Sequence, residues 1–313
     1  MSEHETSTLK APTHHPVIGT AEGLRPLAGG GDPLAGAMIT AVHSDGSDLW
    51  VLVGRRDLHR VAGESAELVA SLGAGDAGTC VGSHRGRLWI GGDNAGLWRL
   101  TGTRLEEVAS FQDAPSRADW HTPWGGPPAV FSMASDGTDM YVSVHVGGIL
   151  RSADGASWVP TIDLHDDVHQ VAVGPDGTVW AATGRRGLAE SRDRGETWRY
   201  HSDGLHASYL LAVATVTGGV LVAASSGHGA RDGAVYRFDR DRFIRCDGLP
   251  DDLEGAVGPR HLAAAGDHAV VALPNGDVYT SRDAGNEWTR DATNLTAVSE
   301  VTLHNGDVNP SSR

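Results

Sequence analysis

The chain has 313 residues, of which 40% are apolar and 42 are glycine, and its formal net charge is −15. A surface this acidic repels phosphate backbones, which excludes nucleic acid as a general partner, and no run of 18 or more apolar residues offers a membrane span. Abundant glycine with enough apolar residues for a large core predicts many short strands joined by tight turns.

The N-terminal segment carries acidic residues and lacks the basic and apolar regions of a secretory signal. Residues 1–14 are therefore predicted to form a disordered tail. Cys80 and Cys246 lie far apart, as expected of two free thiols in a reducing compartment rather than of a disulfide framework. These features predict a cytoplasmic protein; the alternative is a secretory signal that this sequence no longer carries.

One pattern recurs along the chain: a short apolar strand, a tight turn, a second strand and a third strand. Asp-Gly pairs such as Asp136-Gly137 occupy the first turn, because both residues tolerate positive φ. The repeat length is that of a four-stranded propeller blade. The central residues of the second strands, 39 to 52 positions apart, are Trp50, Trp89, Tyr141, Trp180, Val222 and Val271.

Two fragments remain outside the six complete units. Residues 15–27 match a second and third strand, and residues 298–304 match a first strand. Joined, they would form a seventh blade closed by both termini, which removes the sheet edge that invites aggregation. The prediction is an all-β, seven-bladed propeller over residues 15–305, with six blades as the alternative. Residues 111–129 are predicted to be a loop insertion on one face, and 306–313 a flexible tail.

A sharper motif follows three of the third strands. It reads SRDRGETW at 191–198, SRDAGNEW at 281–288 and, one residue shorter, SADGASW at 152–158. The motif resembles the Asp-box, S-x-D-x-G-x-T-W, of BNR-repeat propellers. Its Asp accepts backbone N–H groups, its Gly takes a positive φ and its Trp packs between blades. That resemblance implies the propeller fold; the group includes sialidases, other glycoside hydrolases, sortilin-type receptors and the photosystem II assembly factor type, so fold does not fix function.

The sialidase pattern can be compared with the sequence residue by residue. That family uses an arginine triad, a tyrosine nucleophile paired with a glutamate, an aspartic acid and an N-terminal Arg-Ile-Pro. Here the nearest match to the last is Leu24-Arg25-Pro26, and no tyrosine with a paired base can be placed. Arg55-Arg56 and Arg185-Arg186 recur at one point of their blades, as pocket-lining residues or as solvated turn charges. A glycoside hydrolase is therefore disfavoured.

The histidines are the candidate functional residues. In a propeller, ligands usually meet the face where first strands begin and second strands end. Of the 16 histidines, His43 and His304 map to the opposite face. Six map to the ligand face, the first four favoured over the last two: His145, His169, His206, His261, His121 and His228.

Neutral imidazoles are good ligands for Cu, Fe, Zn or Ni, and three or four around an open position would activate water or O₂. We therefore predict a divalent-metal site that acts on a small molecule, without an organic cofactor. Asp166 and Asp167 are candidate ligands or orienting groups, and Trp120 and Trp124 a candidate lid. A non-catalytic scaffold that binds a protein or ligand stays open as the alternative. The sequence leaves open whether the chain is an enzyme, and also its catalytic residues, substrate and oligomeric state.

Overall fold

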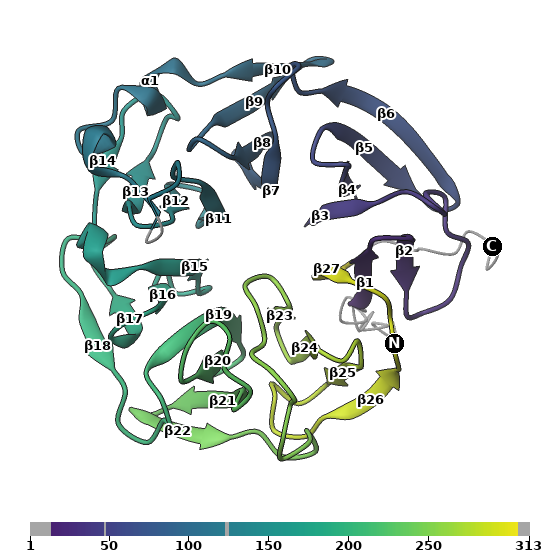
Figure 1. Cartoon of the computed structure of the whole chain (residues 1–313), viewed down its shortest axis with the longest axis vertical. Coiled ribbons are helices and arrows are strands. Elements are labelled where there is room, and N and C mark those ends of the chain that lie inside the picture. The colour runs from purple at the N-terminus through teal and green to yellow at the C-terminus, as the bar shows by residue number, and fades with distance from the viewer. Residues whose placement is uncertain (1–13, 47, 123–124, 306–313) are drawn as a thin grey trace, which may run out of the picture.

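The computed structural model describes residues 14–46, 48–122 and 125–305, which form a seven-bladed β-propeller (Figure 1). The fold class predicted from the repeats is confirmed. Helix is confined, in this part of the chain, to α1 (Ala109–Gln112) and the 3₁₀ turns η1 (Arg117–Asp119) and η2 (Leu164–Asp166), and no helix there is long and apolar enough to cross a bilayer. The predicted tails at 1–14 and 306–313 lie outside the described residues, except for His14.

Six blades have four antiparallel strands in chain order. Blade 1 contains β3 (Ile39–Asp45), β4 (Asp48–Val53), β5 (Asp57–Ala62) and β6 (Ser65–Ser71). Blade 2 contains β7 (Gly78–His84), β8 (Arg87–Gly92), β9 (Leu97–Thr101) and β10 (Arg104–Glu107). Blade 3 contains β11 (Val130–Ser135), β12 (Met140–Val144), β13 (Gly148–Ser152) and β14 (Val159–Pro160).

Blade 4 contains β15 (Val168–Val173), β16 (Val179–Thr183), β17 (Gly187–Ser191) and β18 (Arg199–His201). Blade 5 contains β19 (Tyr209–Val216), β20 (Gly219–Ser225), β21 (Ala234–Asp239) and β22 (Arg242–Arg245). Blade 6 contains β23 (Leu262–Ala265), β24 (His268–Ala272), β25 (Val278–Ser281) and β26 (Thr289–Ala292).

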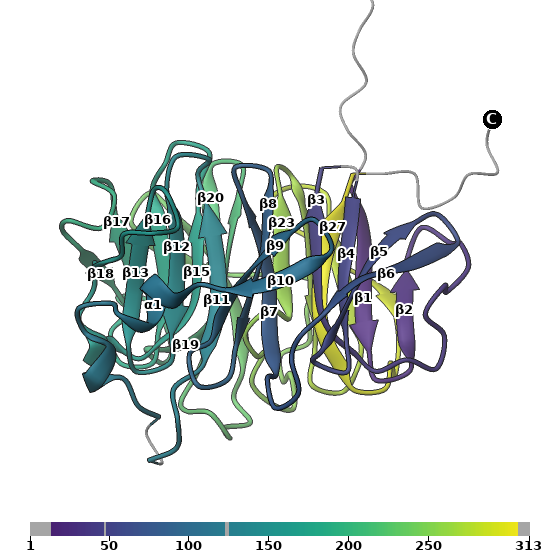
Figure 2. The same ribbon diagram turned by 90° about the horizontal axis from the view of Figure 1, so that it is seen from above.

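The seventh blade joins the two ends of the chain. It consists of β27 (Val298–His304), β1 (His15–Thr20) and β2 (Gly23–Pro26), with β27 innermost. β27 and β1 are antiparallel, so that Val17 lies opposite Thr302 and Ile18 opposite Val301. In Figures 1 and 2 this blade closes the ring beside blade 1. The closure predicted from the two terminal fragments is confirmed.

The core consists of apolar clusters at and between blades rather than one central core. Among the predicted second-strand centres, Trp89, Tyr141, Val222 and Val271 are buried, because each lies between its own sheet and a neighbouring one. Burial of these interblade surfaces supplies most of the favourable free energy that holds the blades together.

Each of the three predicted outer turns is organised by its serine and aspartate. Ser191 Oγ accepts the N–H of Gly195 at 2.7 Å and donates to Asp193 at 2.8 Å, and Asp193 accepts the N–H of Thr197 at 2.9 Å. Ser281 repeats these contacts, and Ser152 does so in the shorter copy. The hydrogen bonds of the motif therefore stabilise the outer turn.

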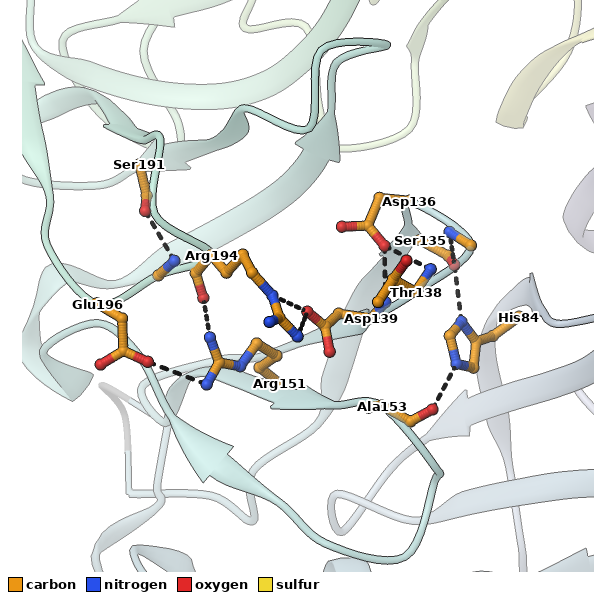
Figure 3. A network of polar contacts seen from close by, with 12 residues as sticks. His84, Ser135, Asp136, Thr138, Asp139, Arg151, Ala153, Ser191, Arg194 and Glu196 are labelled. Carbon is orange, nitrogen blue, oxygen red and sulfur yellow. Dashed lines mark hydrogen bonds and ion pairs between the residues drawn. The ribbon is translucent and has the colours of Figure 1, made fainter.

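The turn of blade 4 also docks on blade 3 (Figure 3). The guanidinium of Arg194 binds the buried carboxylate of Asp139. In return Arg151 Nη1 donates to the carbonyl of Arg194 at 2.6 Å, and Arg151 Nη2 lies 3.1 Å from Glu196. These contacts fix the relative position of two blades that also carry the candidate site.

A β-bulge occurs near the start of five consecutive first strands. In each, one extra residue lies between two successive paired positions, and the register shifts there. A bulge bends the strand and re-aims a side chain, and bulges are common beside functional sites. The extra residues are Thr40, Thr79, Phe131, His169 and Leu211.

Candidate metal centre

Three side chains from blades 3 and 4 converge at the end of the propeller where the first strands begin. His145 follows β12, and its backbone N–H donates a hydrogen bond to the carbonyl of Ala129 at 2.9 Å. Asp167 ends η2 in the left-handed conformation with φ 55°, and His169 is the bulge residue of β15. One donor atom from each lies within 4.8 Å of the others, and no second such group of three His, Cys, Asp or Glu occurs among the described residues.

The carboxylate of Asp167 lies between the two imidazoles. Oδ1 is 3.1 Å from His145 Nε2, and Oδ2 is 3.6 Å from His169 Nε2. The side chains of His145 and His169 are 6% and 3% exposed, whereas that of Asp167 is 18% exposed. Burial opposes ionisation of Asp167, but the hydrogen bond from His145 and the nearby imidazoles outweigh it and lower the pKa of this carboxyl. The lowered pKa favours an ionised carboxylate beside two buried imidazoles, and Asp167 is the most exposed of the three groups.

The tautomer of His169 follows from its partners. Nδ1 lies 2.6 Å from the carbonyl oxygen of Leu210, which only accepts, so Nδ1 carries the proton. Burial lowers the pKa of His169, which favours the neutral ring and leaves a lone pair on Nε2. This lone pair faces Asp167 Oδ2, and the hydroxyl of Tyr209 donates to it at 3.3 Å. An imidazole oriented through Nδ1 by a carbonyl is the usual arrangement of a metal-ligating histidine.

The walls of the site leave little space around these groups. Phe131 stacks on His145 with ring centroids 4.4 Å apart. A Cβ at Gly184 would lie 2.4 Å from Asp167 Oδ2 and 3.0 Å from His169 Cε1. The N–H of Gly184 donates to the Asp167 carbonyl at 2.9 Å, which holds the backbone against the site. Only glycine fits there without moving the donor groups.

The other two favoured histidines lie elsewhere. His206 stacks on Tyr236, its Nδ1 is 2.9 Å from the tyrosine hydroxyl, and its Nε2 is 3.8 Å from Asp232. His261 donates from Nε2 to the carbonyl of Val298 at 3.1 Å, and burial lowers its pKa to about 4. Neither belongs to the three-residue group.

The remaining predicted residues have other surroundings. His121 is exposed, with Nδ1 2.9 Å from the carbonyl of Asp119, and His228 is exposed in the loop between β20 and β21. Asp166 accepts a hydrogen bond from Tyr200 instead of joining the site.

The insertion between blades 2 and 3 differs from the prediction. It contains α1 and η1 where a loop is predicted. Trp120 is buried against Phe111, with ring centroids 5.3 Å apart, so it is a core residue and the lid prediction is wrong for it. Trp124 lies outside the described residues.

Sequence reasoning missed Phe131 and Tyr209. Phe131 occupies in blade 3 the bulge position that His169 occupies in blade 4, and Tyr209 opens the first strand of blade 5. Alignment of the first strands by their starting residues would have brought both into the predicted site.

No family model matches the sequence, and no curated protein matches it. Among solved structures, YCF48 from Cyanidioschyzon merolae superposes with a TM-score of 0.56 at 15% identity, over 83% of this chain and 87% of that chain. YCF48 bound to D1 peptide gives 0.57 at 14% identity, over 91% and 87% of the two chains. A GH74 enzyme from Niastella koreensis gives 0.56 at 13% identity, over 88% of this chain but 46% of that one. Identities this low show a shared propeller fold and nothing finer.

Proposed function

We propose that this propeller binds one divalent transition metal through His145, Asp167 and His169 and uses it to act on a small molecule. The observation that carries the proposal is the convergence of two imidazoles and one carboxylate with donor atoms within 4.8 Å. The proposal keeps two of the six predicted histidines and one of the two predicted aspartates. It leaves His206, His261, His121 and His228 outside the inner ligand set.

Two histidines and one carboxylate on one side of a metal leave open positions for water, O₂ or substrate, which suits Fe(II) and also zinc hydrolysis. A metal held there would supply either Lewis acidity or redox chemistry, and its identity decides between them. The Tyr209 hydroxyl, 3.3 Å from His169 Nε2, is a further proton donor beside the proposed ligands.

Elemental analysis of protein purified without a histidine tag tests the proposal. We expect about one equivalent of Fe, Zn, Cu or Ni, and a loss of at least ten-fold in affinity for the metal in Asp167→Asn and His169→Ala. His206→Ala is the matched control and should keep the metal, because His206 binds Tyr236 instead. Circular dichroism establishes that each variant is folded. Stoichiometric metal in folded His169→Ala, or none in the wild type after reconstitution, would contradict the proposal.

A non-catalytic binding propeller is the second candidate. The fold is shared with YCF48 in a structure with bound D1 peptide, so the architecture is compatible with peptide recognition. This reading expects a co-purifying protein and no stoichiometric metal. A glycoside hydrolase stays disfavoured, because Arg55 is paired with Asp93 and Arg186 with Asp166 instead of forming a free cationic cluster.

We also propose kinship with BNR-repeat propellers and a cytoplasmic location. The first is supported by the repeated hydrogen bonds of Ser152, Ser191 and Ser281 in the outer turns. The second is supported by Cys80 and Cys246, which are both free and buried. Localisation of a fluorescent fusion tests the second proposal, and export of the fusion from the cytoplasm would overturn it.

A further inference from the structure

A cavity lies on the propeller axis and is separate from the candidate metal centre. It has a volume of about 290 Å³ and is lined by residues of all seven innermost strands, β3, β7, β11, β15, β19, β23 and β27, which surround the centre of Figure 1. The volume corresponds to about ten water molecules. We call this cavity the axial chamber.

Arg260 lies at one end of the axial chamber and connects several blades. It precedes β23 and has φ 64°. Its backbone N–H donates to Gln170 Oε1 at 3.0 Å, and its Nη1 donates to the carbonyl of Thr79. Nη1 also lies 3.5 Å from Glu300 Oε2, which accepts the N–H of Val42 at 3.0 Å. Blades 2 and 7 therefore hold the guanidinium, and blade 4 holds the backbone of Arg260.

The other edge of this guanidinium is not engaged. All side-chain hydrogen bonds of Arg260 leave from Nη1. Nε is buried and has no hydrogen-bond partner in the described part of the chain, and no contact of Nη2 occurs there either. Nε–H and the adjacent Nη2–H point in parallel, which is the fork that binds both oxygens of a carboxylate. A buried N–H without a partner is costly, so a small shift of the neighbouring atoms that admits a ligand oxygen to Nε would be stabilising.

The chamber offers one permanent cation to such a ligand. Arg260 is the one Lys or Arg among its lining residues and lies beside Glu300, the one Asp or Glu among them. Burial raises the pKa of Glu300 to about 7, so at neutral pH this carboxyl offsets only part of the arginine's charge. His43 is neutral at pH 7 because burial lowers its pKa to about 4. Hydroxyl groups of Ser132 and Thr302 also line the chamber. Its surroundings therefore suit a short, polar organic anion.

The chamber continues toward the face opposite the candidate metal centre. Ser135, Val173, Thr215 and Ala264, which lie at or near the ends of the first strands, line both the chamber and a groove of about 740 Å³ on that face. Arg260 precedes its first strand and so lies at the other end. A ligand would enter from the groove and meet the guanidinium at the far end of the chamber.

We propose that the axial chamber binds a small organic carboxylate through the Nε–Nη2 edge of Arg260. The site does not depend on the proposed metal centre, so the two proposals stand or fall separately.

Isothermal titration of the full chain with acetate, succinate and benzoate, in the presence of EDTA, tests the inference. We expect binding of at least one carboxylate, weakened about ten-fold or more in Arg260→Lys, because lysine keeps the charge but cannot offer two parallel donors. Arg56→Gln is the matched control, since that exposed arginine lies outside the chamber, and it should bind as the wild type does.

A second variant covers the case in which Arg260→Lys does not fold. Ala264→Leu narrows the chamber where it meets the groove and leaves every contact of Arg260 in place. It should keep the wild-type melting temperature and lose carboxylate binding. A wild type that binds none of the three carboxylates at millimolar concentration overturns the inference, as does undiminished binding in the folded variants.

Discussion

Glu300 is a buried carboxyl whose ionisation the fold opposes. Its carboxyl is buried at the propeller axis, accepts the N–H of Val42 at 3.0 Å and lies 3.5 Å from Arg260. Burial raises its pKa to about 7, although Arg260 and the hydrogen bond from Val42 oppose this rise. The other titratable groups beside it do not add a charge at neutral pH, because burial raises the pKa of Cys80 to about 11 and lowers that of His43 to about 4.

The raised pKa makes stability depend on pH in a defined direction. The pKa of Glu300 is 4.5 in the unfolded chain and about 7 in the folded protein. Between these two pH values the folded protein holds the proton that the unfolded chain has lost, so the free energy of unfolding falls as the pH rises. Each pKa unit between the folded and the unfolded value corresponds to about 1.4 kcal/mol of stability. In urea denaturation at pH 5 and pH 8, we expect the wild type to lose more stability than Glu300→Gln over that interval. Parallel pH profiles of the two proteins would contradict the assignment, because all other groups titrate in both.

The candidate centre shows what a sequence can and cannot predict about single side chains. Strand ends assigned His145 and His169 to one face, and the structure brings their rings together there, because the pattern fixes which face a strand end reaches. The same reasoning placed His206 there, but its ring stacks on Tyr236. His169 is the extra residue of the β15 bulge, which re-aims it, whereas His206 lies before β19. One inserted residue leaves no mark in the hydrophobic alternation.

Glycines in different kinds of turn have different tasks, as Gly285 in an outer turn and Gly177 in the turn between β15 and β16 show. Gly285 has φ 84°, and a Cβ there would lie 2.5 Å from Leu221 Cδ2, a fully buried side chain of the preceding blade. Gly177 has φ 80°, but nothing lies within 4 Å of its Cβ position. The two positions therefore separate backbone strain from interblade packing.

We expect Gly285→Ala to destabilise the propeller more than Gly177→Ala. Both substitutions carry the cost of positive φ, about 1 kcal/mol, and only Gly285→Ala adds overpacking against Leu221, about 1–3 kcal/mol more. Chemical denaturation measures the difference. In a double-mutant cycle with Leu221→Ala the extra cost should shrink; equal losses at the two glycines would mean that the turn does not pack on the next blade.

Elements with strong periodicity were predictable, and short irregular ones were not. Alternation and turn dipeptides located all six second strands in the described structure. The insertion was expected to be a loop, yet α1 places Phe111 in the core, where its ring meets Trp158 at a centroid distance of 4.8 Å. A helix of four residues is too short to show a 3.6-residue period, so its stability comes from this tertiary packing.

At the scale of the whole molecule, the ring exists because its two ends share a sheet. β27 is paired with β1 along its length, and Ile18, Val301 and Leu303 form a buried cluster with Val270 of blade 6. The requirement for a closed ring made this blade predictable from two unmatched fragments. β27 also carries Glu300, which connects it to Arg260 at the axis.

Removal of the closing strand should therefore affect the whole ring. A chain that lacks residues 297–313 would leave the edge of β1 unpaired and expose Ile18, so we expect a melting temperature lower by roughly 10 °C, equivalent to several kcal/mol, together with oligomers in size-exclusion chromatography. A synthetic peptide of residues 296–305 should restore both the monomer and the melting temperature. The same peptide with Val301→Asp is the control and should not, because Val301 must be buried beside Ile18. A truncated chain that stays monomeric with unchanged melting temperature would show that six blades close without the seventh.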